Sequence, residues 1–458
     1  MILSKEQINR YIRHIVMPEI NVKGQEKLLE STVSVYGENT DNLTTAVLYL
    51  SAMGIGKILC HLKDDLGYDS LFYNAEDLNN DVSIEIINEN FSADNADARV
   101  IIGSISFIKD VINKNEFVPT IISMVNGVNE WKGTLQAFIE PERLNEYIQF
   151  AGGGKCYNKE KNLLIASFSG ALCSVECVKL ILNIGKIHEN LLMFDLLTME
   201  FSNFNQDRYE AAICEFNIEN NISLSKKEII RKLNNSKVLI VGTGGLGSPA
   251  AIGLAVSGIG TIGLLDSDKV ESSNLNRQIL HSVSRIGAPK AESAKFFISN
   301  INHNTNIITH VLELNLENAE DTIREYDAVI AAVDNIQTRY IINDTSYLLK
   351  KPVIESGVLS FDGTNTTIIP GEGHCYRCLY PDVNTRGTTC TEAGILGAIP
   401  GVMGFIEAIE LVKVIANIGV TLKNKILMFD GLEMEFNIIN LEKNPNCNVC
   451  GKKDDLIS

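Results

Sequence analysis

The sequence predicts an α/β fold in which two doubly wound domains follow one another in a single chain. Short runs rich in Val and Ile, such as KVLIVG and AVIAAV, alternate with amphipathic helical stretches, a pattern typical of parallel βαβ units. One of these runs is followed directly by the glycine-rich turn GTGGLG and a helix. The chain is also written twice, since VKLILNIGKIHENLLMFDLLTMEF from Val178 returns as VKVIANIGVTLKNKILMFDGLEMEF from Val412.

The repeat predicts the domain organisation. At 458 residues the chain has room for two domains with their own cores. LSKEQINR near the N-terminus is echoed by LSKKEIIR, so we expect the domains at residues 1–216 and 217–458, divided within the polar segment EFNIENNISLSKKE. Ser4 and Gln7 have the spacing of a capping box, which predicts that the first helix begins there.

Composition and charge exclude several classes of protein. The formal net charge of −17 argues against a nucleic-acid partner, because binding a phosphate backbone needs clustered Lys and Arg. No uninterrupted apolar run reaches the roughly 18 residues of a membrane span, so we expect no membrane partner. The N-terminal segment lacks the apolar core of a signal peptide. We therefore expect a cytoplasmic protein whose ten cysteines are thiols or metal ligands.

The turn GTGGLG has the chemistry of a phosphate-binding loop. Its glycines, Gly242, Gly244, Gly245 and Gly247, let the backbone approach a phosphate, and the following helix N-terminus favours negative charge. Asp266 ends the next predicted strand, where an acid is expected to accept hydrogen bonds from ribose hydroxyls. Dehydrogenases share this motif, and a purely structural turn is the alternative.

The segment after Asp266 favours a nucleoside triphosphate over a dinucleotide. Arg277 and Lys290 follow the ribose acid and would neutralise a triphosphate and the charge of departing pyrophosphate. Asp334 ends a later strand, at the sheet edge where ligands of such folds bind, and is suited to hold magnesium. The alternative for any lone basic residue is a solvated helix surface.

Together these segments resemble the ubiquitin-activation superfamily, in particular the MoeB/ThiF/HesA-type adenylyltransferases. The matching segments include VLIVGTGGLGSPA, LLDSDKVESSNLNRQILH, GAPKAESA, AAVDNIQTR and NPNCNVCG, and they run through nearly all of the second half. The resemblance implies two Rossmann-like ThiF-type domains and adenylation of a protein's C-terminal carboxylate with ATP and Mg²⁺. By motif position it assigns ATP and magnesium binding to Gly245, Asp266, Ser273, Asn274, Arg277, Lys290, Asp334 and Asn335, and Arg339 matches another site arginine.

Four cysteines form two CxxC pairs in the second half. Cys375 and Cys378 lie in CYRC, and Cys447 and Cys450 lie in CNVC. Four thiolates in two such pairs satisfy a tetrahedral Zn²⁺ ion, and a set without an open position indicates a structural metal. A disulfide or unrelated thiols are the alternatives, and the expected cytoplasmic location favours zinc.

The remaining cysteines differ in their surroundings. Cys390 lies on the polar segment NTRGTTCTEAGILG ahead of an apolar helix, where a thiol near a helix start has the setting of a nucleophile. In ThiF-like relatives a cysteine here is linked to sulfur transfer or acyl capture, whereas MoeB-like relatives adenylate without it. A free thiol with no chemical role is the alternative. The others are expected to be small core residues: Cys60, Cys156, Cys173, Cys177 and Cys214.

The first half has lost the nucleotide-binding groups one by one. Its turn reads GENTDN, whose two carboxylates would repel phosphate. Leu62 stands where the second half has Asp266, and VIIGSISF carries no acid where the second half has Asp334. PERLNEY replaces CYRCLY. We therefore expect the first half to bind neither ATP nor zinc.

The first half keeps RYIRH, a segment that the second half has lost. In MoeB-like relatives the second arginine of this segment reaches across a two-fold dimer into the partner's ATP site. The resemblance assigns that role to Arg13. We expect the halves to form an internal pseudo-dimer in which Arg13 completes the site around Gly245 and stabilises the leaving pyrophosphate. The alternative is that the first half only covers a hydrophobic interface.

The predicted function is that of an ATP-dependent adenylyltransferase. Its substrate would be the C-terminal glycine carboxylate of a small ubiquitin-like sulfur-carrier protein ending in Gly-Gly, with a sulfurtransferase as a further partner. One alternative is adenylation of a peptide, as in microcin-type antibiotic maturation, and another is activation of a ubiquitin-like modifier for conjugation. A non-catalytic scaffold conflicts with the full set from Gly245 to Arg339, and an NAD-dependent dehydrogenase has no use for Arg277 and Lys290.

Overall fold

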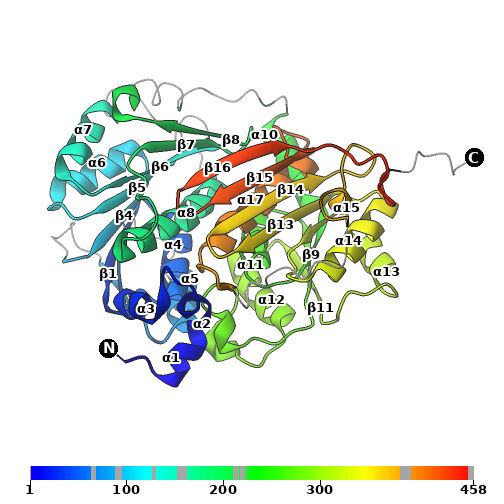
Figure 1. The fold of residues 1–458 in the computed structure, drawn as a ribbon, viewed down its shortest axis with the longest axis horizontal. Helices are drawn as coiled ribbons and strands as arrows, with labels where there is room; N and C mark the ends of the chain where they lie inside the picture. Colours follow the sequence, from blue (N-terminus) through cyan, green and yellow to red (C-terminus); the bar gives the residue numbers. More distant parts are fainter. Residues whose placement is uncertain are drawn as a thin grey trace, which may run out of the picture.

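The computed structural model describes residues 2–62, 69–87, 95–125, 130–151, 162–209, 216, 222, 224–381 and 393–451. It contains two eight-stranded sheets, one built from each half of the chain (Figure 1). The first sheet has the order β3-β2-β1-β4-β5-β6-β7-β8 and the second has the order β11-β10-β9-β12-β13-β14-β15-β16. The two topologies are identical, which confirms the predicted pair of doubly wound α/β domains.

In each sheet the first five strands of the fold are parallel and the last three are antiparallel. The strands of the first sheet are β1 (Thr32–Gly37), β2 (Lys57–Leu62), β3 (Ser83–Ile87), β4 (Ala98–Gly103), β5 (Thr120–Met124), β6 (Lys132–Phe138), β7 (Leu191–Asp195) and β8 (Glu200–Phe204). Those of the second are β9 (Lys237–Val241), β10 (Thr261–Leu265), β11 (Asn306–His310), β12 (Ala328–Ala331), β13 (Val353–Leu359), β14 (Asp362–Ile368), β15 (Lys425–Asp430) and β16 (Glu435–Asn440).

The helices cover both faces of each sheet. In the first half they are α1 (Lys5–Arg10), α2 (Ile12–Ile15), α3 (Asn21–Glu30), α4 (Thr40–Met53), α5 (Asp69–Leu78), α6 (Ile105–Lys114), α7 (Pro141–Ala151) and α8 (Leu163–Leu182), followed by the 3₁₀ turn η1 (Gln206–Arg208). In the second half they are α10 (Lys226–Asn234), α11 (Gly247–Val256), η2 (Ser272–Asn274), η3 (Val283–Arg285), α12 (Lys290–Ile301), α13 (Ala319–Arg324), α14 (Ile336–Leu348), α15 (Tyr376–Leu379) and α17 (Ile399–Ala416).

A single hydrophobic core joins the two halves. It includes residues of α4 and α8 from the first half and of α11 and α17 from the second, together with the inner faces of both sheets. Two smaller clusters lie on the outer faces, one for each sheet. Among the described helices, α8 is long and apolar enough to cross a membrane, but 94% of its most apolar stretch is buried inside the protein. We therefore read α8 as the central helix of the shared core.

The contacts between the halves occur in equivalent pairs. After β7, the Leu197 carbonyl accepts a hydrogen bond from Val420 N at 2.8 Å, and after β15 the Leu432 carbonyl accepts one from Lys186 N at 2.9 Å. Phe436 of β16 stacks on Phe201 of β8 with ring centroids 4.1 Å apart, where the two edge strands lie side by side (Figure 1). This reciprocity is that of an internal pseudo-dimer.

The N-terminal helices of the two halves differ in number. Both α1 and α10 begin with a capping box, built by Ser4 with Gln7 and by Ser225 with Glu228. The end of α10 nevertheless takes the position of the end of α3, since the last turn of each accepts a hydrogen bond from a glycine N–H at 3.0 Å. Helix α2, which carries Arg13, has no counterpart between α10 and β9.

Candidate nucleotide site and cysteine cluster

The glycine-rich turn joins β9 to α11 at the carboxyl edge of the second sheet. Gly242 has φ +94°, and a Cβ there would lie 2.4 Å from the Ala332 carbonyl oxygen. A Cβ at Gly247 would lie 1.9 Å from the Gly242 carbonyl oxygen. These two positions require glycine for the turn itself. Gly244 and Gly245 are less enclosed, and α11 begins without a side-chain cap, so its first N–H groups remain available to an anion.

Asp266 directly follows β10 beside this turn. Its Oδ2 accepts hydrogen bonds from the Thr243 N–H at 2.8 Å and the Thr243 hydroxyl at 3.0 Å, and its Oδ1 accepts one from Asp268 N at 2.9 Å. The carboxylate therefore fastens the turn to the neighbouring strand. Its two oxygens have further lone pairs, so ribose hydroxyls can still donate to them.

Both predicted cations contact residues of the site region. Arg277 donates from Nη1 to the Asn276 Oδ1 at 2.8 Å and to the Ser273 carbonyl at 3.1 Å, and its Cδ is 3.7 Å from the place of a Cβ on Gly245. Lys290 begins α12, and its side chain is only 8% exposed, with Nζ 2.9 Å from Asp268 Oδ2. Neither arrangement matches a fully solvated helix surface.

The polar residues of η2 mainly shape the chain. The Ser273 hydroxyl lies 3.5 Å from Glu271 Oε2, and the Asn274 Oδ1 accepts a hydrogen bond from Glu271 N at 3.2 Å. Asn335 is the N-cap of α14, because its Oδ1 accepts a hydrogen bond from Thr338 N at 2.8 Å. Their predicted contacts with ATP stay predictions.

Asp334 and Arg339 point to different environments. Asp334 is exposed in the loop after β12, at the same sheet edge as Asp266. The Arg339 side chain is 10% exposed and forms an ion pair with the buried Glu355 of β13. Its Nη2 also donates to the Val333 carbonyl at 2.6 Å, directly before Asp334. The guanidinium therefore supports the loop that presents Asp334.

Arg13 lies where the first half touches this site. It is partly buried in α2, and its carbonyl oxygen accepts a hydrogen bond from Ile395 N at 3.1 Å. The segment after Ile395 continues to Pro400, which lies 3.2 Å from the place of a Cβ on Gly245. The structure thus brings the helix carrying Arg13 to the chain segment that borders the glycine turn.

His281 is a supporting residue that the sequence did not single out. Its Nε2 is 3.0 Å from the Thr243 carbonyl, and its Nδ1 is 3.0 Å from the Ser293 hydroxyl on α12. Burial and the nearby Lys290 lower the pKa of His281 to about 3, so the ring is neutral at pH 7. A neutral imidazole between the turn and α12 holds both without adding charge.

In the first half an internal carboxylate fills the equivalent region. Glu38, in the altered turn, accepts hydrogen bonds from the Ser104 N–H and the Ser104 hydroxyl, both at 3.0 Å. Counted from the paired residues Ala98 and Ala328, Ser104 has the position of Asp334. Leu62 pairs with the Gly37 backbone and offers no acceptor. A fixed anion therefore stands at the site where a phosphate would have to bind.

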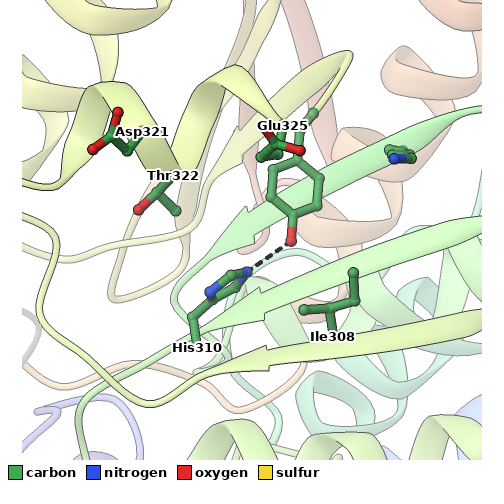
Figure 2. Close-up of a pocket in the computed structure, with 7 residues that line it drawn as sticks. Ile308, His310, Asp321, Thr322 and Glu325 are labelled. Carbon is green, nitrogen blue, oxygen red and sulfur yellow. Dashed lines mark hydrogen bonds between the residues drawn. The ribbon is translucent and has the colours of Figure 1, made fainter.

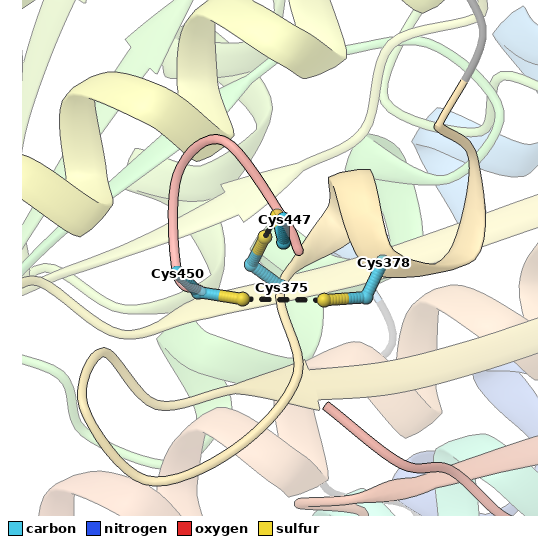
Figure 3. A group of neighbouring side chains, drawn as sticks. All are labelled: Cys375, Cys378, Cys447 and Cys450. Atoms are coloured by element: carbon cyan, nitrogen blue, oxygen red, sulfur yellow. Dashed lines mark hydrogen bonds between the residues drawn. The ribbon is translucent and has the colours of Figure 1, made fainter. Parts of the chain in front are cut away.

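The four predicted metal ligands come together (Figure 3). The sulfurs of Cys375, Cys378, Cys447 and Cys450 all lie within 4.8 Å of one another, and all four cysteines are free thiols in the structure. The first pair follows β14 and the second lies near the C-terminal end of the described chain, so a metal ion here would clip that end to the sheet. Donor set and spacing fit a closed tetrahedral site.

Three of the six other cysteines lie in the described part of the chain. Cys60, Cys173 and Cys177 are buried, as expected of core residues, and burial raises the pKa of each thiol. Cys390 lies outside the described residues, as do Cys156 and Cys214. The predicted chemistry of Cys390 therefore stays a prediction.

A cavity of about 340 Å³ lies apart from the predicted site. Figure 2 shows it between β11 and α13, with the His310 Nε2 2.7 Å from the Tyr326 hydroxyl. Its lining residues are Lys237, Ile308, His310, Asp321, Thr322, Glu325 and Tyr326. None of them belongs to the predicted nucleotide-binding set.

The family match lies in the second half of the chain. Residues 218–449 match the model of the ThiF family. The chain is 46% identical over 222 residues to "Adenylyltransferase and sulfurtransferase MOCS3" of Drosophila ananassae, which covers 48% of this chain and 49% of that protein. The protein of the same name from Aedes aegypti is 42% identical over 228 residues, or 49% of this chain and 52% of that protein. The chain thus spans about half the length of the curated relatives it matches.

Among solved structures, "Crystal structure of E. coli MccB + MccA-N7isoASN" is similar with a TM-score of 0.45 and 20% identity, covering 73% of this chain and 98% of that chain. The family match covers half of the chain, the part that contains the glycine turn, Asp334 and three of the four clustered cysteines, Cys375, Cys378 and Cys447. On this evidence the chain belongs to the ThiF family.

Proposed function

We propose that the chain is an ATP-dependent adenylyltransferase with one working site, in its second half. The observation that carries the proposal is the convergence of the glycine turn, Asp266, Arg277, Lys290 and Asp334 at one sheet edge. The name of the matched relatives supports the reaction class. The domains of this proposal are residues 1–216 and 217–458.

The turn and the α11 N-terminus would hold the phosphates of ATP, and Asp266 would accept the ribose hydroxyls. Asp334 would hold Mg²⁺, and the ion would supply positive charge to neutralise the triphosphate. A substrate carboxylate, already ionised at neutral pH, attacks the α-phosphorus. The bond from the α-phosphorus to the bridging oxygen breaks, giving an acyl-adenylate and pyrophosphate. Arg277 and Lys290 stabilise the charge on the departing pyrophosphate.

Two further arginines complete the proposed site. Arg13, lent by the degenerate half through α2, would add positive charge at the pyrophosphate. Arg339 would act from behind, by fixing the Val333 carbonyl and with it the direction of Asp334. The four-cysteine cluster would hold Zn²⁺ as a structural ion that fastens the C-terminal segment.

The exposure of the second sheet supports a proposal for where a protein substrate docks. The strands β7 (LLMFD) and β15 (ILMFD) are nearly identical, yet Met193 is 5% exposed and Met428 is 43% exposed. Tyr147 of α7 and Tyr209 belong to the cluster that covers Met193. On the matching face of the second sheet, Met428 is joined by the exposed side chains of Ile439 and Leu359.

We propose that this exposed patch of Met428, Ile439 and Leu359 binds a small ubiquitin-like sulfur-carrier protein whose Gly-Gly end enters the nucleotide site. An exposed apolar patch of this kind is typical of a protein-binding surface. The word sulfurtransferase in the relatives' name supports sulfur as the fate of the activated carboxylate, with a sulfurtransferase as further partner. Cys390 is the proposed acceptor within this chain.

ATP–pyrophosphate exchange tests the proposal. The assay uses the full chain, Mg²⁺ and ubiquitin-fold proteins ending in Gly-Gly from the same genome, each compared with a version lacking the last two glycines. We expect exchange only with an intact Gly-Gly end, and its loss in Asp334→Asn. Exchange with short peptides instead would favour peptide adenylation, and no exchange with any acceptor would refute an adenylyltransferase.

A further inference from the structure

Helix α2 of the first half is tied to the second half by two adjacent residues. The Arg13 carbonyl accepts a hydrogen bond from Ile395 N, and the His14 Nε2 accepts one from Gly397 N, each at 3.1 Å. His14 is completely buried. Its other ring nitrogen, Nδ1, lies 2.8 Å from Gln25 Oε1. A side chain of the degenerate half thus pairs with the backbone beside the working site.

The hydrogen-bond network defines the state of the histidine ring. The Gln25 Nε2 donates to the Met53 carbonyl at 3.0 Å, so its Oε1 faces His14 as an acceptor. His14 must therefore carry its proton on Nδ1, which leaves the lone pair of Nε2 for Gly397 N–H. Burial lowers the pKa of His14 to about 4, with a smaller effect from Arg277, so this neutral form is the one present at pH 7.

From Gly397 the contact continues to the nucleotide site. A Cβ on Gly397 would lie 2.1 Å from the Asn276 carbonyl oxygen, so the two backbones touch. The Asn276 side chain accepts a hydrogen bond from Arg277, and Arg277 borders Gly245. The placement of Gly397 therefore sets the distance between α2 and the glycine turn.

We propose that His14 is a positioning residue of the adenylation site: its hydrogen bond to Gly397 fixes α2 against the second half so that Arg13 meets the nucleotide. This inference rests on the proposed function. The degenerate half then has two roles, because helix α2 supplies both Arg13 and the His14 contact that positions it.

The test compares three substitutions in the full chain. His14→Leu fills similar space but leaves Gly397 N–H without an acceptor, whereas His14→Gln can still donate to Gln25 and accept from Gly397. His61→Leu is the control, since His61 is a buried histidine of the same half that stacks on Tyr36. An unpaired buried donor is costly, so we expect His14→Leu to lower kcat for adenylation at least about tenfold with little change in KM for ATP. His14→Gln should stay within about threefold of the wild type, and His61→Leu should leave kcat unchanged.

A double substitution separates positioning from stability. In an Arg13→Ala background, His14→Leu should have no further effect, because the residue it aims is already gone. Losses that multiply, or a His14→Leu enzyme as fast as the wild type, would overturn the inference. So would an Arg13→Ala enzyme that keeps its activity.

Amide hydrogen exchange decides the contact independently of catalysis. Exchange at Gly397 should rise at least about tenfold in His14→Leu and stay protected in His14→Gln and in Arg13→Ala. Unchanged protection in His14→Leu would refute the contact. A wild-type chain that adenylates nothing would refute the proposed function and the positioning role, while the exchange result would still stand for the interface.

Discussion

Glu407 lies completely buried on α17, and we predict that replacing it with Gln changes how stability depends on pH. Burial raises the pKa of Glu407 from 4.5 to about 8, against the opposing effect of Arg339. Between these values the native state binds a proton that the unfolded chain releases. Stability contributed by this residue therefore falls as pH rises from about 4.5 to about 8, and then levels off. Gln cannot ionise, so the variant lacks this slope.

The size of the effect follows from the same pKa values. The full difference between pH 4.5 and pH 8 corresponds to roughly 5 kcal/mol, at 1.36 kcal/mol for each unit. Between pH 6 and pH 9, an experimentally accessible range, Glu407→Gln should gain roughly 2–3 kcal/mol in unfolding free energy relative to the wild type.

Urea unfolding followed by circular dichroism at pH 6, 7, 8 and 9 measures this gap. Glu372→Gln serves as the control, because Glu372 is exposed and its pair with Lys423 lies at the surface. The control should run parallel to the wild type at every pH. A gap between Glu407→Gln and the wild type that stays constant with pH would mean that Glu407 is already ionised in the folded protein, and the reasoning would fail.

Four further outcomes are expected. Gly242→Ala should abolish ATP binding measured by calorimetry, since φ +94° and a backbone oxygen 2.4 Å from the new Cβ distort the turn; normal affinity would contradict this. Metal analysis should find about one zinc per chain, lost in Cys375→Ser together with several degrees of melting temperature. Lys413→Met leaves Glu410 buried without its cation and should cost about 3–5 kcal/mol in urea unfolding; a neutral result would refute the importance of the pair. Met428→Glu should weaken binding of the Gly-Gly-ended partner at least about tenfold while ATP binding is unchanged, and equal affinity would refute the docking face.

The fold was readable from the sequence because the chain repeats itself. The segment KIHENLLMFDLLTMEF in the first half and its repeat VTLKNKILMFDGLEMEF in the second half predicted equivalent strands. The two sheets indeed have identical strand orders. The two CxxC pairs likewise predicted a cluster of four cysteines, because only one contact, that between the two pairs, had to be inferred. Each of these patterns consists of residues close together in the sequence, so it can be recognised without the structure.

What the sequence did not predict depends on residues that meet only in space. The contact of Arg339 with the nucleotide stays a prediction, whereas its ion pair with Glu355 of β13 could not be predicted, because no spacing rule relates the two residues. The same is true of His281 beneath the Thr243 carbonyl and of Glu38 at Ser104. The echo of α1 in α10 does not extend to their places in the fold, because a helix start signal specifies a cap, and the end of α10 corresponds to the end of α3.

The reciprocal turns after β7 and β15 have a consequence for how such a molecule can change over time. In a dimer of identical subunits every substitution appears in both subunits. One subunit therefore cannot be optimised to supply the arginine while the other is optimised to bind the nucleotide. When both copies are encoded in one chain that constraint is removed, and the sequences of the two halves can diverge independently. Because the halves are tethered, dilution cannot separate them, and assembly of the site no longer depends on protein concentration.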